Sequence, residues 1–201
     1  MYSSQPDAAN GYDSQILDGA LSTTNYGTTD KLNVGEENGA SQNARALIKF
    51  DLSTIPIGSI VTSAILYLKV AGNSAGVTST LNVYRFIKAW TEEGVTWEKY
   101  NGVNNWTTFG GFNASDCENT AIGSVSVIAA ASGEYAITLD AAKIEEMLPG
   151  GVFTNNGFMI KMGTESNDQH RWYSSDDVTA SNRPKLVIEH NKSSGNFLAF
   201  F

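Results

Sequence analysis

The stretch IVTSAILYLKV, residues 60–70, is the longest strand candidate in this 201-residue chain. Apolar residues occupy every second position of its second half, and Tyr67 and Lys69 stand at two of the positions between them. A period of two is typical of a β-strand with one face on a core and the other toward solvent. We therefore expect an inward face formed by Ala64, Leu66, Leu68 and Val70.

Shorter apolar runs recur on both sides of this stretch, separated by clusters of Gly, Asn, Ser and Asp. This rhythm is typical of a β-sandwich, and no strand–helix alternation, which a parallel sheet needs, is visible. The other predicted strands are residues 14–17, 31–34, 44–52, 81–90, 122–130, 134–139, 157–162, 171–174 and 185–190. In residues 44–52, charged residues alternate with apolar ones, which predicts one exposed face. Residues 81–90 are apolar on both faces, which predicts a central strand.

One short helix is expected over residues 141–148. Asp140 stands where an N-cap side chain belongs, and Pro149-Gly150-Gly151 ends the segment. No internal repeat and no interdomain linker are visible. We therefore predict a single sandwich domain over residues 1–190 and a tail over residues 191–201.

Composition excludes several classes of function. The net charge of −8 is spread along the chain, so binding to the phosphate backbone of a nucleic acid is disfavoured. Cys117 is the one cysteine, which rules out an intrachain disulfide, and with two histidines a zinc site of His and Cys ligands is nearly excluded. No apolar run approaches the ~18 residues of a membrane span. Residues 1–6 have neither the basic patch nor the apolar stretch of a secretory signal. We therefore expect a location on a virion surface or outside the cell, with no signal peptide in this chain.

Several short pieces of sequence stand in order between Gln15 and His190. They include Asn25-Tyr26-Gly27, residues 45–53, Trp90-Thr91-Glu92, Val95-Thr96-Trp97 and Arg183-Pro184-Lys185-Leu186. In this order they resemble the DNRLRE domain family, which is close to a group of alginate-binding carbohydrate-binding modules and to repeats of an archaeal disaggregatase. The resemblance implies a jelly-roll sandwich of cell-surface proteins, polysaccharide-degrading enzymes and phage structural proteins, and it does not imply catalysis. We therefore expect an all-β fold, a jelly-roll antiparallel β-sandwich with one short helix.

Glycan binding needs flat aromatic rings that stack on sugar faces and polar groups that bind hydroxyls. The candidate glycan-binding residues are Tyr26, Trp106, Arg171, Trp172 and Tyr173. Three of them have a structural alternative. Trp106 lies in a polar loop and fits packing equally well, and for Trp172 with Tyr173 we favour an edge-strand aromatic pair. For Trp90 and Trp97 we favour core packing.

Hydrolysis of a glycan needs two carboxylates that face each other across a cleft. Glu92, Glu93, Glu98 and Asp116 cluster in sequence, but their spacing does not place them opposite one another. The nucleophile motif Gly-x-Ser-x-Gly does not occur. We therefore expect a protein that is not an enzyme and has no catalytic residues.

Calcium is the most plausible metal, because sandwich loops bind it through carboxylate and carbonyl oxygens. Two groups of acids are candidates, namely Asp7, Asp13, Asp18 and Asp30, or Asp168, Asp176 and Asp177. No Asp-x-Asp-x-Asp-Gly loop is present, so solvated turn residues are the alternative, no cofactor is expected and the metal ligands stay unassigned.

The chain ends on an apolar segment that is costly to leave in water, at ~25 cal/mol per Å² of apolar surface. Its docking candidates are Phe197, Leu198, Phe200 and Phe201. The first hypothesis is therefore a non-enzymatic structural protein, a phage decoration or head–tail accessory protein, anchored through its termini in a large assembly and expected to be a homo-oligomer. The alternative is a carbohydrate-binding module for acidic or neutral polysaccharides, associated with a polysaccharide-degrading enzyme. Neither hypothesis includes a nucleic acid or a membrane as partner.

Overall fold

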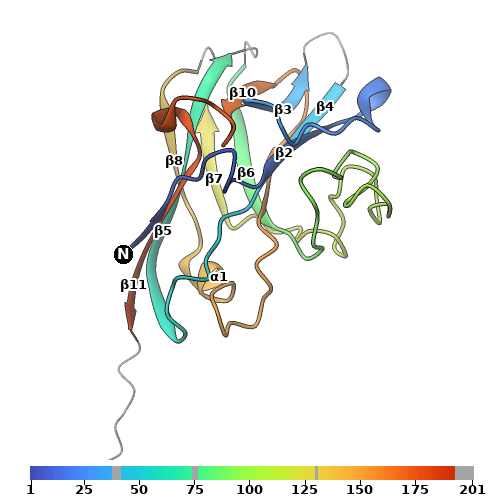
Figure 1. Cartoon of the computed structure of the whole chain (residues 1–201). Coiled ribbons are helices and arrows are strands. Elements are labelled where there is room, and N and C mark those ends of the chain that lie inside the picture. The colour runs from blue at the N-terminus through green and yellow to red at the C-terminus, as the bar shows by residue number, and fades with distance from the viewer. Residues whose placement is uncertain (38–41, 74–76, 130, 193–201) are drawn as a thin grey trace, which may run out of the picture.

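The computed structural model describes residues 1–37, 42–73, 77–129 and 131–192 (Figure 1). Eleven strands dominate these ranges. They are β1 (Tyr2–Ser4), β2 (Asp13–Leu17), β3 (Lys31–Glu37), β4 (Gln42–Ile48), β5 (Ser59–Asn73), β6 (Ser79–Arg85), β7 (Gly123–Val127), β8 (Glu134–Thr138), β9 (Phe158–Met162), β10 (His170–Tyr173) and β11 (Lys185–Lys192). The helices are α1 (Ala141–Glu145) and two short 3-10 turns, Gly19–Leu21 and Ala180–Asn182.

The strands form one curled sheet whose two halves face each other as the layers of a sandwich (Figure 1). The first layer contains β1, β11, β5 and β8, and the second contains β2, β4, β9, β6 and β7. The two layers are connected because β10 pairs with both β5 and β3, and β3 pairs with β4. All these pairs are antiparallel, which confirms the predicted all-β sandwich.

Strand β5 lies in the first layer between β11 and β8, and its two faces differ as its alternation predicted. Its inward residues Ala64, Leu66 and Leu68 are at most 1% exposed, whereas Tyr67 and Lys69 are only half-buried on the opposite face. Opposite its end, the register of β10 shifts between Arg171 and Trp172. This register shift lies opposite Gly72, whose φ of +150° is a conformation that residues with side chains disfavour. At this end β5 therefore pairs with β10, the strand that links the first layer to β3.

Much of the second layer is buried on both faces, because Arg45 and Leu47 on the outer face of β4 are at most 8% exposed, which corrects the predicted exposed face of residues 44–52 at these positions. Asp51 is exposed as predicted, and so are Ser124 and Ser126 of β7. Residues 86–122, which we call the covering segment, run over the outer face of this layer (Figure 1). A second apolar cluster lies between them. It contains Ile16, Leu47, Tyr84, Phe86, Trp90, Val95, Trp106, Cys117 and Met159. The strand predicted over residues 81–90 ends at Arg85 in the structure. Phe86 and Trp90, which the prediction included in that strand, lie in the covering segment and pack in the second cluster.

Helix α1 closes one end of the sandwich (Figure 1). The Asp140 carboxylate caps it, since its Oδ1 accepts hydrogen bonds from the backbone N–H groups of Ala142 (3.0 Å) and Lys143 (3.3 Å). Ile144 packs in the main core, the apolar cluster between the two layers that also contains Leu66 of β5 and Ile160 of β9. Regular helix ends at Glu145, three residues before the predicted end, and the chain continues in turns.

In the described ranges, no helix is long and apolar enough to cross a membrane. Cys117 is buried, and burial raises the pKa of its thiol far above its ordinary value. The predicted docking residues Phe197, Leu198, Phe200 and Phe201 lie outside the described residues.

Candidate functional site

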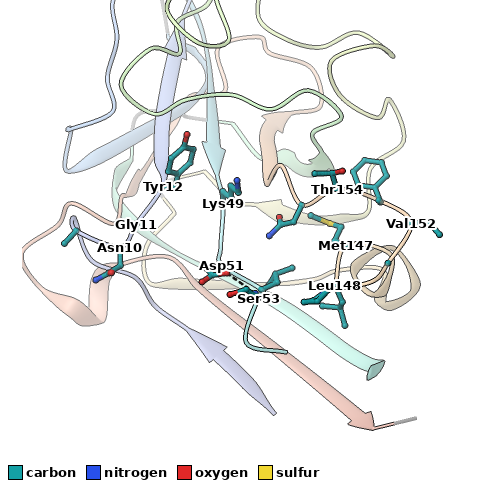
Figure 2. Close-up of a pocket in the computed structure, with 16 residues that line it drawn as sticks. Asn10, Gly11, Tyr12, Lys49, Asp51, Ser53, Met147, Leu148, Val152 and Thr154 are labelled. Atoms are coloured by element: carbon teal, nitrogen blue, oxygen red, sulfur yellow. Dashed lines mark hydrogen bonds between the residues drawn. The ribbon is translucent and has the colours of Figure 1, made fainter. Parts of the chain in front are cut away.

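A groove with a volume of about 740 Å³ lies beside α1 (Figure 2). Three segments that are distant in sequence form it, namely residues 9–12 before β2, residues 49–53 after β4 and residues 147–155 after α1. Figure 2 shows Asn10 on one side, Thr154 on the other, and Lys49 and Asp51 between them. The groove is thus assembled by loops that the sandwich brings together.

Hydrogen bonds from side chains to backbone hold these loops in place. Asp51 Oδ1 accepts from the Ser53 N–H at 2.9 Å, which turns the chain after β4. The Asp51 carbonyl accepts from the hydroxyl of Tyr2 at 2.6 Å. Asn155 Nδ2 donates to the Phe50 carbonyl at 2.8 Å and so ties the third segment to the second. Because polar groups of the walls already bind each other, the shape of the groove is built into the fold.

Lys49 and Tyr12 stand side by side in this groove. The Lys49 N–H donates to the Tyr12 carbonyl at 2.8 Å, and its Nζ lies 5.4 Å from the centre of the Tyr12 ring. Within the described residues, this ammonium group forms no hydrogen bond and no ion pair. The Tyr12 hydroxyl donates to the Trp90 carbonyl at 2.9 Å, and the two rings are 4.7 Å apart. The aromatic ring is therefore fixed, while the cation is available to a ligand.

The charges in the groove nearly balance. The Ser53 N–H and hydroxyl, followed by the charge of Lys49, lower the pKa of Asp51, so its carboxylate is ionised at neutral pH. Among the described residues that line the groove, Asp51 is the only carboxylate. A glycosidase needs two carboxylates across the scissile bond, so the groove offers binding groups and not an acid–base pair.

The walls combine two kinds of surface. Met147, Leu148, Val152 and Phe153 supply apolar area, and Asn10, Ser53, Thr154 and Asn155 supply hydroxyls and amides. A sugar ring has apolar faces and hydroxyl edges, so it can contact both surfaces at once. The arrangement suits a polyhydroxylated ligand.

Burial corrects two of the predicted glycan-binding residues. Trp106 is 3% exposed, stacks on Phe86 at 5.6 Å and donates its Nε1–H to the Thr96 carbonyl at 2.9 Å. Trp172 is 1% exposed and packs edge-on against Tyr135 at 5.6 Å in the main core. Neither ring offers a face to a sugar, because both faces are in contact with other side chains.

The other three predicted residues lie at the surface but outside the groove. Arg171 is exposed, and its Nε donates to Asn33 Oδ1 at 3.1 Å. Tyr173 is half-buried and lies two residues farther along β10, on the same face. Tyr26 is half-buried in its loop, where its carbonyl accepts from the Thr29 hydroxyl at 2.9 Å. Their role in glycan binding stays a prediction.

Trp90 and Trp97 lie at different depths. Trp90 is buried in the second cluster, in line with the packing interpretation. Trp97 is half-buried and lies under the Arg45 guanidinium, 4.6 Å from its ring centre.

The sequence cluster of acids is held by separate partners. Asp116 is fully buried, accepts from the Thr107 N–H at 2.8 Å and pairs with Lys88 at 2.6 Å. Glu98 accepts from the Ser22 hydroxyl at 2.8 Å. Glu92 Oε1 accepts from the Asp13 N–H at 2.8 Å. These bonds give three of the four carboxylates a structural task at separate positions, and the fourth, Glu93, is exposed.

The two groups of calcium candidates are rearranged in the fold. Asp7 caps its own turn, Asp18 binds Asn43, and Asp168 binds Ser79 and Thr164. Asp13 and Asp176, one from each group, come together, because Asp13 Oδ2 accepts from the Ser175 N–H at 2.7 Å. Over the described ranges, no three side chains of His, Cys, Asp or Glu converge as metal ligands.

The residues that form the groove were missed by the sequence prediction. Turn signals are visible in Asp51-Leu52-Ser53 and in Pro149-Gly150-Gly151. They indicate loops, but they do not tell which loops meet. The sequence does not show that β2 pairs with β4, and this pairing places Tyr12 beside Lys49.

A search of curated protein sequences gave no match. The sequence model of carbohydrate-binding module family 96 matches residues 6–190. That match spans the eleven-stranded sandwich apart from β1 and the last two residues of β11, and it includes all three segments of the groove. The chain therefore belongs to carbohydrate-binding module family 96.

Proposed function

We propose that this chain is a non-catalytic module that binds a polysaccharide in the groove of Figure 2. The observation that carries the proposal is the free ammonium group of Lys49 beside the fixed ring of Tyr12. Family membership supports a carbohydrate as the ligand class. The groove supports the place, because it combines this pair with apolar walls and the exposed hydroxyl of Thr154.

The roles of the residues follow from their chemistry. The Lys49 ammonium can donate up to three hydrogen bonds, to ring hydroxyls or to the carboxylate of an acidic sugar. Thr154, exposed on the opposite wall, can bind a second hydroxyl of the same chain. The surface between them is apolar enough to receive a sugar face. We expect binding of an acidic polysaccharide to weaken with salt, and binding of a neutral one to be nearly insensitive to salt.

The family match favours this alternative over a phage decoration protein. An extracellular location forms part of the proposal, since the polysaccharides that such modules meet lie outside cells. Assembly into a particle and homo-oligomerisation remain separate predictions. Deletion of residues 196–201 tests them, because it should abolish incorporation into a particle and leave glycan retention unchanged.

The test is affinity electrophoresis in gels that contain one acidic or one neutral polysaccharide each. Lys49→Ala should lower the affinity at least about tenfold, since a hydrogen bond to a charged group contributes ~1.5–3 kcal/mol. Thr154→Val, which removes the hydroxyl at nearly constant volume, should lower it a few-fold. The matched control is Lys185→Ala, which removes the same charge from the outer face of β11.

Lys185 is the informative control because it lies beside an aromatic ring, that of Tyr67, on the outer face of the first layer. Its Nζ is 4.3 Å from the centre of the Tyr67 ring, so this face also presents a cation on an aromatic ring. Loss of retention in Lys185→Ala with unchanged retention in Lys49→Ala contradicts the groove and places the glycan on the sheet.

A further inference from the structure

A second group of polar side chains lies behind the groove, at the start of β2. Asp13 follows Tyr12 and is 2% exposed. Its Oδ2 accepts from the Ser175 N–H at 2.7 Å, but its buried Oδ1 has no hydrogen-bond partner in the described part of the chain. The Ser175 hydroxyl is buried beside the same carboxylate without forming a hydrogen bond of good geometry. Two buried oxygens are thus left unsatisfied at one place.

Further carboxylates surround this position. Glu92 accepts from the Asp13 N–H at 2.8 Å. Asp176 follows Ser175 in the chain, and its Oδ2 is also buried without a partner. Within the described ranges, none of these three acids forms an ion pair, and the nearby Asp30 is already paired with Lys31 at 2.6 Å. The described residues therefore gather negative charge here and pair none of these three acids with a cation.

Neither protonation state of Asp13 satisfies this arrangement by itself. A protonated carboxyl needs an acceptor for its O–H, and a carboxylate needs donors or a cation at both oxygens. Oδ1 has neither among the described residues. A buried polar oxygen without a partner costs ~1–3 kcal/mol, so an additional group is expected here.

We propose that Asp13 and Asp176 bind a calcium ion, with the Ser175 hydroxyl as a further oxygen ligand. The donor set decides the metal: oxygen ligands from carboxylates and hydroxyls suit a hard cation, and Ca²⁺ accepts 6–8 oxygens in flexible geometry that water completes. Such a site needs only two carboxylates, which is compatible with the lack of any convergent group of three His, Cys, Asp or Glu side chains in the described ranges.

The bound cation would join two parts of the chain. Asp13 begins β2, and Asp176 follows β10, so the ion would connect the second layer to the turn after the linking strand. Gly11 packs so closely on Ser175 that a side chain at position 11 has no room. Asp13 is next to Tyr12 of the groove, so the calcium ion also supports that wall. The site is independent of the proposed glycan, and its test uses no glycan.

The test starts from the full chain stripped with a chelator and measures thermal unfolding and calorimetric binding with added Ca²⁺. We expect the melting temperature to rise by on the order of 5–10 °C at about a hundred times the dissociation constant. Asp13→Asn should abolish this rise. Asp7→Asn is the matched control, because Asp7 caps an exposed turn, and it should keep the full rise.

If Asp13→Asn does not fold, Asp176→Asn replaces it, since this side chain is only partly buried. Absence of both a melting shift and binding heat in the stripped wild type up to about 10 mM Ca²⁺, a range that includes weak extracellular sites, overturns the proposal and assigns the unsatisfied oxygens to water. A calcium-dependent rise that Asp13→Asn and Asp176→Asn retain also overturns it.

Discussion

On the outer face of β5, Tyr67 and Lys69 meet solvent, whereas on the outer face of β4, Leu47 lies at 0% exposure beneath the covering segment. Both strands alternate with a period of two, and both use one face for the main core. The difference lies in what packs on the second face. The open layer therefore presents a flat surface, while the covered layer carries a second core and, beside it, the groove.

The covering segment also explains where the groove lies. Tyr12 packs on Trp90 of that segment and binds its carbonyl, so the second core fixes one wall. The opposite wall follows α1, which rests on the main core. The groove thus lies where the two cores meet, and nothing comparable supports the open face.

The largest expected effect comes from a matched pair of leucines. Leu47→Ala in the second cluster and Leu66→Ala in the main core should each lower the free energy of unfolding by about 2–5 kcal/mol, because both side chains are fully buried. Urea denaturation measures both values. A loss below about 1 kcal/mol for Leu47→Ala alone would show that the covering segment is only loosely attached.

Arg45 provides the next comparison, because it anchors the covering segment to β4. Its guanidinium binds both oxygens of Glu165 at 2.7 and 2.9 Å and the Gly110 carbonyl at 2.7 Å. Arg45→Lys keeps the charge but cannot make this fork, so we expect a loss of about 1.5–3 kcal/mol in unfolding free energy. Lys69→Arg on the open face is the control and should stay within about 0.5 kcal/mol of wild type.

A smaller effect is expected at the end that both layers share. Asp140→Ala removes the cap of α1 and should cost about 1 kcal/mol of stability. Asp140→Asn, which keeps a capping oxygen, should recover most of that loss. Equal stability of wild type and Asp140→Ala in urea denaturation would mean that packing of Ile144 alone holds the helix.

The smallest effect should come from the open face. Tyr67→Ser removes the ring that Lys185 covers, and we expect a change of about 1 kcal/mol or less, since the ring is only half-buried on the outer face of the sheet. Urea denaturation beside the Leu47→Ala variant makes the contrast between the two layers direct. A cost near 2 kcal/mol would indicate that this face is also part of a packed surface.

The sequence predicts the open layer better than the covered one. Alternation located β5 and its inward face, and Asp140 with the following turn residues located α1. Residues 81–90 looked like one buried strand because periodicity does not distinguish a sheet core from a covering loop. For Trp106 the polar neighbours left sugar binding and packing equally open, and the structure shows those neighbours facing solvent while the indole turns inward.

The groove was beyond sequence reasoning for a different physical reason. Its three segments are separated by about 35 to 140 residues, and only the register of β2 on β4 and the position of α1 bring them together. Tyr12 and Lys49 carry no motif of their own. The candidate calcium ligands were easier to recognise from the sequence. However, Asp13 and Asp176 lie near each other in the structure, although the sequence analysis placed them in different groups.

The most direct test of the central claim is a residue-resolved NMR titration of the wild-type chain with an oligosaccharide from the polysaccharide that retains it in gels. The account predicts that the largest amide shifts fall in residues 9–12, 49–53 and 147–155, with residues 63–69 and 185–189 unchanged. Shifts concentrated in residues 63–69 and 185–189 would contradict it and move the glycan to the open face.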